Sequence, residues 1–352
     1  MKSTDYNRRR FLGAAAISLG AVAELALTGF TNAVSRHTDP SKHARAAYNG
    51  YTTLGPVKQV NAGLLNVGYA EAGPSDGPVV ILLHGWPYDI YTYADVAPLL
   101  AAAGHRVIIP FVRGYGTTQF LSDSTFRNGQ QSALALDIIH LMDALKIEKA
   151  TIGGCDWGAR TANIIAALWP ERLKGLVSVS GYLVANRNTG NVPLMPEAEL
   201  QWWYQYYFAT ERGKAGYEKY RSEFARLIWQ TASPKWDFGD TVFNRSAASL
   251  NNPDHVSVVI HNYRWRLGLA PGEAEYDKFE DRLAGGPVIT VPTITLEGDA
   301  NGAPHPDASA YAKKYTGKYK HKVITGGIGH NLPQEAPKDF AAAILEVDSW
   351  AR

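Results

Sequence analysis

The stretch GGCDWG, residues 153–158, decides the fold that this 352-residue sequence predicts. A short apolar run precedes it at 150–152, and apolar residues with helical spacing follow it at 159–168. A strand, a tight turn and a helix, with small residues two positions before and after the central residue, form a nucleophile elbow. The turn is strained, and strand and helix approach so closely that only small flanking side chains fit. We therefore predict that residue 156 is a nucleophile at the tip of this turn.

The residue at the centre of the turn determines the chemistry. Centring the turn on Asp156 places Gly154 and Gly158 at the two small positions. Centring it on Cys155 would instead place Trp157 where only a small residue fits. An aspartate carboxylate attacks an sp³ carbon and forms an ester with the enzyme, which water then hydrolyses. The sequence therefore predicts an aspartate nucleophile, argues against a serine acyl hydrolase, and leaves the cysteine as a small apolar residue at a strand end.

Apolar runs alternate with helical patterns on both sides of this turn. Continuous apolar runs, typical of strands buried on both faces, occur at 79–83, 107–109, 150–152 and 173–179. Helical spacing lies between them at 92–103, 130–146 and 159–168, and a strand pair is expected at 57–73. Strands that alternate with helices form a parallel sheet with right-handed crossovers. We expect an α/β protein with a mostly parallel central sheet flanked by helices.

The alternation stops after the fourth of these strands. The residues that follow are rich in aromatic side chains and show helical spacing, which predicts a helical cap inserted into the sheet domain. Strands at 293–296 and 322–324, with helices near 309–315 and up to 348, complete the predicted sheet. The expected organisation is a first core part at 50–182, a cap at 183–288 and a second core part at 289–352.

The N-terminus carries a candidate export signal. The run NRRRFL at 7–12 resembles a twin-arginine signal, with Arg8 and Arg9 as the pair, and a weakly apolar stretch and small residues follow it. Glu24 and several glycines make that stretch a poor permanent membrane span. We expect a signal peptide at 1–33, export by the twin-arginine machinery, and a periplasmic or secreted protein. The alternative is a basic tail before an amphipathic helix.

The composition narrows the class of partner. The formal net charge is only +2, which gives no reason to expect a nucleic-acid partner. The single cysteine cannot form an internal disulfide. No set of histidines, cysteines and acids has the spacing of metal ligands, so we expect neither a metal nor another cofactor.

A second motif follows the run at 79–83. It reads HGWP at 84–87, and a loop at this place lends a backbone N–H to the oxyanion that forms when an enzyme ester is attacked. The backbone N–H groups of Trp86 and Trp157 are therefore the predicted oxyanion hole.

These motifs together resemble the epoxide hydrolases and haloalkane dehalogenases of the α/β-hydrolase fold, over nearly all of residues 57–350. The matching motifs are HGWP at 84–87, RGYG at 113–116, the turn at Asp156, and the pair Gly329-His330. The resemblance implies the α/β-hydrolase fold and a histidine that activates the hydrolytic water. His330 fits this role, since a near-neutral pKa suits a general base.

Two cap tyrosines favour an epoxide as the substrate. Tyr204 lies in YQYYF at 204–208 and Tyr263 in NYR at 262–264, both of which resemble the tyrosine motifs of epoxide hydrolases. A phenol hydrogen-bonds an epoxide oxygen and can protonate the alkoxide that forms. The leading hypothesis is therefore a hydrolase that opens an epoxide to a vicinal diol through an Asp156 ester. Its expected substrate is a small apolar or aromatic electrophile.

Two other functions stay open. A dehalogenase would use the same nucleophile, and Trp157, a predicted substrate-binding residue, is compatible with either chemistry. Fluoroacetate dehalogenases, which this chain resembles at residues 158–160, hold the substrate carboxylate with an arginine directly after the nucleophile, where this chain has tryptophan. Arg160 remains a candidate for substrate binding, or for an ion pair in the first turn of a helix. The third hypothesis is a non-catalytic small-molecule-binding protein.

The acid that should orient His330 is absent from its usual positions. In the family that the chain resembles it lies three residues past the glycine that ends the strand after the cap, and here that residue is Asn301. The other usual position, after the strand before the cap, reads VSG at 179–181. An Asp→Asn change at this acid costs on the order of 10⁴ in rate in serine proteases, so a substitute is expected. Asp299 is the first choice, and the alternatives are Asn301 itself, Asp307 and Glu297.

Overall fold

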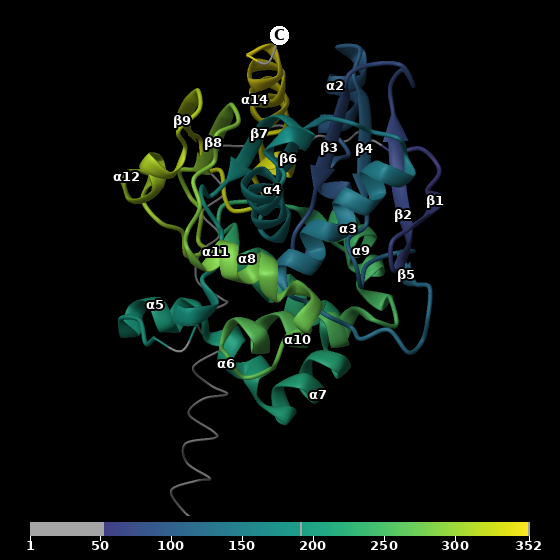
Figure 1. Cartoon of the computed structure of the whole chain (residues 1–352). Coiled ribbons are helices and arrows are strands. Elements are labelled where there is room, and N and C mark those ends of the chain that lie inside the picture. The colour runs from purple at the N-terminus through teal and green to yellow at the C-terminus, as the bar shows by residue number, and fades with distance from the viewer. Residues whose placement is uncertain (1–52, 191, 351–352) are drawn as a thin grey trace, which may run out of the picture. The chain divides into compact units, whose positions relative to one another are not determined.

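The computed structural model describes residues 53–190 and 192–350, and the predicted signal peptide lies outside them. A single central sheet has the strand order β1-β2-β4-β3-β6-β7-β8-β9, with β5 paired to β2 (Figure 1). The strands are β1 (Lys58–Ala62), β2 (Leu65–Ala72), β3 (Val79–Leu83), β4 (Arg106–Pro110), β5 (Gln119–Phe120), β6 (Ala150–Gly154), β7 (Leu173–Val179), β8 (Thr293–Gly298) and β9 (Tyr319–Ile324).

The sheet is mostly parallel, which confirms the predicted α/β class. Strands β4, β3, β6, β7, β8 and β9 pair in parallel, while β1, β2 and β5 add an antiparallel edge. Because β3 lies between β4 and β6, its carboxyl end lies beside that of β6, with Leu83 in register with Gly154. The HGWP loop and the turn at Asp156 therefore begin side by side, although many residues separate them in the chain.

Alternate side chains of each central strand enter two different apolar cores. In β3, Val80 and Leu82 belong to the core that α2 (Val96–Ala102) and α14 (Pro337–Ser349) cover. Ile81 and Leu83 belong to the core covered by α3 (Gln131–Ala144) and α4 (Trp157–Leu168). This alternation follows from the two-residue period of a strand, and burial on both faces explains why the run at 79–83 is wholly apolar.

Helices fill the chain between β7 and β8, and no strand lies there among the described residues. Figure 1 shows them gathered at one end of the sheet. They are α5 (Pro196–Gln201), α6 (Trp203–Ala209), α7 (Glu211–Lys219), α8 (Arg221–Ala232), α9 (Gly239–Ala247), α10 (His255–Arg266) and α11 (Asp277–Ala284). Short 3₁₀ turns accompany them at Arg187–Thr189, Ala248–Asn251 and Ala274–Tyr276.

Three local details differ from the sequence prediction. The helix expected at 92–103 is divided into a 3₁₀ turn, Ile90–Tyr93, and α2, because the Asp89 carboxylate accepts the backbone N–H of Tyr91 and begins a turn earlier. The helix expected at 309–315 is divided into α12 (Ala308–Tyr311) and a 3₁₀ turn, Ala312–Lys314. Strand β5 was not predicted, because its two residues are too few to show a periodic pattern in the sequence.

Two short elements remain: a 3₁₀ turn at Pro170–Arg172, between α4 and β7, and α13 (Leu332–Glu335), directly before α14. Across the described residues, no helix combines the length and the apolar character that crossing a membrane requires.

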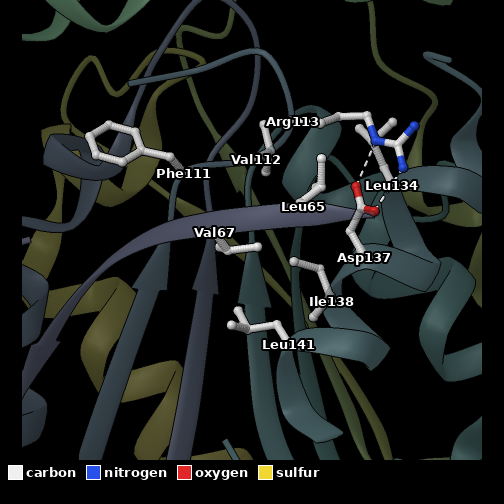
Figure 2. A pocket seen from close by; sticks show the side chains of 9 residues that line it. All are labelled: Leu65, Val67, Phe111, Val112, Arg113, Leu134, Asp137, Ile138 and Leu141. Carbon is white, nitrogen blue, oxygen red and sulfur yellow. Dashed lines mark hydrogen bonds and ion pairs between the residues drawn. The ribbon is translucent and has the colours of Figure 1, made fainter. Parts of the chain in front are cut away.

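The RGYG motif at 113–116 has a structural role in this fold. Arg113 is buried, and its Nε and Nη2 donate to the two carboxylate oxygens of Asp137 at 2.6 and 2.7 Å. Figure 2 shows this pair beside a small apolar cavity between β2 and α3. A buried bidentate pair of this kind fixes geometry because each group satisfies the other's charge. It holds the loop after β4 against α3.

Candidate active site

The turn at Asp156 has the crowded geometry that its glycines imply. The backbone of Asp156 has φ 54° and ψ −121°, a conformation that L-residues rarely adopt. A Cβ on Gly154 would lie 2.4 Å from the carbonyl carbon of Gly158, and a Cβ on Gly158 would lie 1.8 Å from the Leu83 carbonyl oxygen. Only glycine fits either position, so strand β6 and helix α4 can close on each other and leave the aspartate at the tip.

The Asp156 carboxylate lies between the HGWP loop and His330. Its Oδ1 accepts the backbone N–H of Trp86 at 2.8 Å, and its Oδ2 lies 3.6 Å from Nε2 of His330. Gly85 must be glycine here, because a Cβ would lie 2.4 Å from that of Asp156. Burial acts to raise the pKa of Asp156, but the hydrogen bond and charge of His330 and the charge of Arg160 outweigh it and lower the pKa. The carboxylate is therefore ionised at neutral pH, as a nucleophile requires.

His330 is buried, and one of its ring nitrogens has no partner. Burial acts to lower its pKa, but the Asp156 hydrogen bond and the negative charges of Asp156, Glu297 and Glu335 raise the pKa above its ordinary value. No described group hydrogen-bonds Nδ1. The histidine therefore lies among negative charges, but no described acid forms a hydrogen bond with its Nδ1.

The first-choice acid, Asp299, is not brought to His330. Its carboxylate accepts the backbone N–H groups of residues 326, 327 and 328 at 2.8–2.9 Å, and these bonds lower its pKa. The physical reason is local: the glycine loop offers three adjacent N–H donors that satisfy a carboxylate completely. Asp299 thus shapes the loop that leads to the histidine.

The alternative acids are placed differently from one another. Asn301 donates its side-chain N–H to Glu297 Oε1 at 2.7 Å and to Ser180 Oγ at 3.3 Å. Asp307 accepts the backbone N–H of Ser309 and caps α12. Glu297 is buried at the end of β8, and of the named alternatives its charge is the one that raises the pKa of His330.

A glutamate that the sequence did not single out holds the histidine loop. Glu335 accepts from Ser233 Oγ at 2.7 Å and from the backbone N–H groups of Gly329 and Asn331 at 2.6 and 3.1 Å. Burial raises its pKa. Ser233 Oγ also accepts the backbone N–H of His330 at 3.0 Å. An acid five residues after the motif histidine was the available sequence signal, but its partner serine lies in the inserted helices.

A cavity of about 230 Å³ brings most of the predicted site residues together. Asp156 and His330 form its floor with Trp86 and Arg160, and Tyr204 and Tyr263 line it from the inserted helices. The rings of the two tyrosines lie 5.4 Å apart at 84°, and each lies just over 5 Å from the Trp86 ring. Burial raises the pKa of both phenols. They therefore keep their protons and can donate hydrogen bonds into the cavity.

The Trp157 side chain lies in the core behind this cavity. It is 1% exposed, its ring lies 5.8 Å from that of Tyr263, and its indole N–H has no described hydrogen-bond acceptor. The side chain, predicted to bind substrate, is not among those that line the cavity. Its backbone N–H lies at the Asp156 carboxylate and contributes to the lowered pKa of that group.

A buried chain of hydrogen bonds supports the HGWP loop from behind. The Trp86 indole N–H donates to Tyr217 Oη at 2.8 Å, and Tyr217 Oη lies 2.7 Å from His255 Nε2. His255 Nδ1 lies 2.9 Å from the Gly114 carbonyl oxygen. Because burial lowers the pKa of His255 to about 3, the ring is neutral, and the carbonyl requires its proton on Nδ1. Tyr217 then donates to Nε2, so every donor in the chain has an acceptor.

The chain is similar to known proteins of one fold family. The family model of the alpha/beta hydrolase fold matches residues 78–254, and the chain belongs to this family. A crystal structure of a candidate epoxide hydrolase from Klebsiella pneumoniae subsp. pneumoniae MGH 78578 is 60% identical, with a TM-score of 0.83, over 83% of this chain and 97% of that one.

Curated relatives match over shorter stretches. Epoxide hydrolase B of Mycobacterium tuberculosis is 34% identical over 159 residues, which are 41% of this chain and 44% of that protein. A haloalkane dehalogenase of Mycobacterium marinum is 31% identical over 126 residues, which are 35% of this chain and 41% of that protein. The chain thus spans less than half of the length of either curated relative.

Proposed function

We propose that this protein hydrolyses an epoxide to a vicinal diol through a covalent ester on Asp156. The observation that carries the proposal is the cavity in which an ionised carboxylate, a histidine and two neutral phenols face one space. Both groups of curated relatives named above support an electrophilic carbon as the target, and the epoxide hydrolases support the oxygen leaving group.

In the first step, Oδ2 of Asp156 attacks one epoxide carbon. The carbon–oxygen bond of the ring breaks, and the alkoxide takes a proton from Tyr204 or Tyr263. Oδ1 keeps its hydrogen bond from the Trp86 N–H and becomes the carbonyl oxygen of the ester. The two phenols hold the epoxide oxygen during attack because hydrogen bonds strengthen as negative charge develops on it.

In the second step, His330 removes a proton from water and the hydroxide adds to the ester carbon. The backbone N–H groups of Trp86 and Trp157 stabilise the oxyanion. The bond between the carboxyl carbon of Asp156 and Oδ2 then breaks, Oδ2 leaves as the alkoxide of the product, and this alkoxide takes the proton from His330. The carboxylic acid left on Asp156 returns its proton to the tyrosinate. The charges of Glu297 and Glu335, rather than a hydrogen bond to Nδ1, stabilise the imidazolium.

Single-turnover hydrolysis of styrene oxide in ¹⁸O water tests the ester route. We expect diol to form, with the label on the Asp156 carboxylate and not in the diol, because the water oxygen stays on the enzyme when the ester bond breaks. Label in the diol after one turnover would show direct attack by water and exclude the ester. A protein that releases no diol from a panel of epoxides would favour the non-catalytic binding hypothesis.

One observation favours dehalogenation as the second candidate. Arg160 lines the cavity and its buried Nη1 has no described acceptor, and a leaving halide requires an N–H donor or a positive charge. Incubation with haloalkanes and haloacids, followed by halide detection, separates the two reactions. Halide release without diol formation from epoxides would replace the first proposal by this one.

We also propose export of the protein by the twin-arginine machinery, because of the NRRRFL run at 7–12. Replacing Arg8 and Arg9 by lysine should retain the protein in the cytoplasm of its host, and cell fractionation with an antibody measures this. Full-length wild-type protein found only in the cytoplasm would contradict the proposal.

A further inference from the structure

The cavity at Asp156 carries more positive charge than its catalytic groups require. Two arginines line it, Arg160 from the first turn of α4 and Arg266 from the end of α10. Among the described residues, Asp156 is the only carboxylate that lines it. With a histidine whose pKa is raised, the cavity holds two or three positive groups against one negative group. The chain as a whole has a net charge of only +2, so this excess is local.

Arg160 is buried and feels the charge of Asp156, but no described carboxylate forms an ion pair with it. The residue is only 8% exposed, and the Nε of its side chain donates to the Leu183 carbonyl at 3.1 Å. Its Nη1 is buried and makes no hydrogen bond to any described group. An unsatisfied donor of a buried guanidinium is costly, because the group has lost its water without gaining an acceptor.

Arg266 adds a like charge on the same wall. Its guanidinium lies 5.1 Å from the Trp202 ring centroid and 5.7 Å from that of Tyr263, and it makes no ion pair or hydrogen bond with the described residues. Burial first, and the charge of Arg266 second, lower the pKa of Arg160 to about 10. Two neighbouring arginines repel each other in a cavity of low polarity, and an anion between them would remove both costs.

Three other buried or partly buried arginines each pair with a carboxylate. The distances between guanidinium nitrogen and carboxylate oxygen are 2.6–2.8 Å for Arg106 with Glu71, Arg113 with Asp137 and Arg127 with Asp254. Arg160 and Arg266 make no such ion pair with a described carboxylate, although both line the cavity with Asp156, whose charge acts on Arg160.

We propose that the substrate carries a carboxylate, which binds to Arg160 and Arg266 while its electrophilic carbon lies at Asp156. A planar carboxylate suits a guanidinium because two parallel N–H···O bonds form at once. Trp202 and Trp203 line the same cavity and would contact the apolar part of such a molecule. This inference rests on the proposed function for its electrophile, but carboxylate binding can be measured without any reaction.

The test compares an unreactive carboxylate with its neutral amide. Phenylacetate and phenylacetamide are titrated into the full protein while tryptophan fluorescence is recorded, because tryptophans line the cavity. We expect phenylacetate to bind more tightly than the amide. Arg160→Met and Arg266→Met should each weaken phenylacetate binding on the order of tenfold to a hundredfold, as for the loss of a charged hydrogen bond, and leave the amide unchanged.

A matched control lies on the same helix. Arg264→Met removes the same charge from α10, but Arg264 pairs with Glu211 and does not line the cavity. It should leave both affinities unchanged. Arg160→Lys keeps the charge inside and should retain part of the affinity. Because Arg266 is only half-buried, its variant tests the proposal even where Arg160→Met unfolds.

Three results would overturn the carboxylate site. The first is equal affinity for phenylacetate and phenylacetamide, including no binding of either. The second is that Arg264→Met lowers the affinity for phenylacetate as much as the cavity variants do. The third is tighter binding of bromide than of phenylacetate, which would make the arginines a halide site. Diol release from oxirane-2-carboxylate is measured separately. If phenylacetate binds as expected and no epoxide is opened, the carboxylate site stands and the proposed function fails.

Discussion

The turn at Asp156 and the loop at His330 present the two halves of the candidate site, and the chain fixes them by different means. Asp156 is fixed by neighbours close in sequence, since Gly154 and Gly158 allow a strand and a helix to meet. The His330 loop is held by Ser233 from the inserted helices and by Glu335, five residues further along the chain. Both residues of the proposed reaction could be predicted from sequence motifs, but the partners that hold His330 could not, because one of them comes from a distant part of the chain.

The largest change in activity is expected when Asp156, the proposed nucleophile, is replaced. Asp156→Asn removes the charged oxygen that attacks the epoxide in the proposed mechanism and should lower kcat by on the order of 10⁴-fold or more. Pre-steady-state diol formation from styrene oxide measures the loss. The exposed Asp307→Asn, on the cap of α12, is the control and should keep full activity. Substantial activity in Asp156→Asn would remove the ester mechanism.

The local sterics of the turn are tested by one methyl group. In Gly158→Ala the new Cβ would lie 1.8 Å from the Leu83 carbonyl oxygen, and the free energy of unfolding should fall by about 3 kcal/mol. Gly55→Ala is the control, because the nearest atom to its new Cβ, the Glu71 carbonyl oxygen, would be 3.8 Å away, and it should change stability by no more than about 0.5 kcal/mol. Urea unfolding measures both. Equal stability of the two variants would show that the turn is not crowded.

The distant support of the base is tested at Glu297. Its negative charge helps to raise the pKa of His330, so Glu297→Gln should lower that pKa. A general base must be neutral, and the rise of kcat with increasing pH should therefore move to lower pH. We also expect kcat at its plateau to fall about tenfold, less than for loss of an oxyanion donor.

A kcat–pH profile measures the effect of Glu297→Gln, with Asp299→Asn as the comparison. The Asp299 carboxylate is bonded to residues 326–328, so its variant should lower stability without moving the profile in the same way. If the profile moves for Asp299→Asn and not for Glu297→Gln, Asp299 would be the acid that acts on His330, as the sequence first suggested.

The smallest effect is expected at the hydrogen-bonded chain behind Trp86. Tyr217→Phe removes the acceptor of the Trp86 indole N–H and loosens the loop whose backbone N–H holds Asp156. We expect kcat to fall about fivefold with KM unchanged, because a small misplacement affects the reaction more than binding. Steady-state kinetics measure this, with the exposed Tyr220→Phe as control. A change in KM alone would assign Tyr217 to packing.

The parts that the sequence predicts are those with a local physical cause. The strand at 79–83 has the predicted bounds because burial on both faces makes its whole length apolar. The turn at Asp156 is equally local. Arg266 was missed because its role depends on a cavity shared with a helix more than a hundred residues earlier, α4. Asp299 was favoured by its position near Asn301, and sequence offers no sign of the three N–H groups that bind it instead.

The bonds between α8 and the histidine loop have a mechanical consequence. The backbone N–H groups of His330 and Gly302 donate to the Ala232 carbonyl at 3.2 and 2.8 Å, and Ser233 Oγ accepts from His330 as well. The end of α8 therefore anchors two loops at once, the loop at Gly302 after β8 and the loop at His330 after β9. If the inserted helices moved away from the sheet as one rigid body, these hydrogen bonds would break and His330 would lose its alignment with Asp156. We therefore expect substrate and product to enter and leave through smaller movements that keep these bonds.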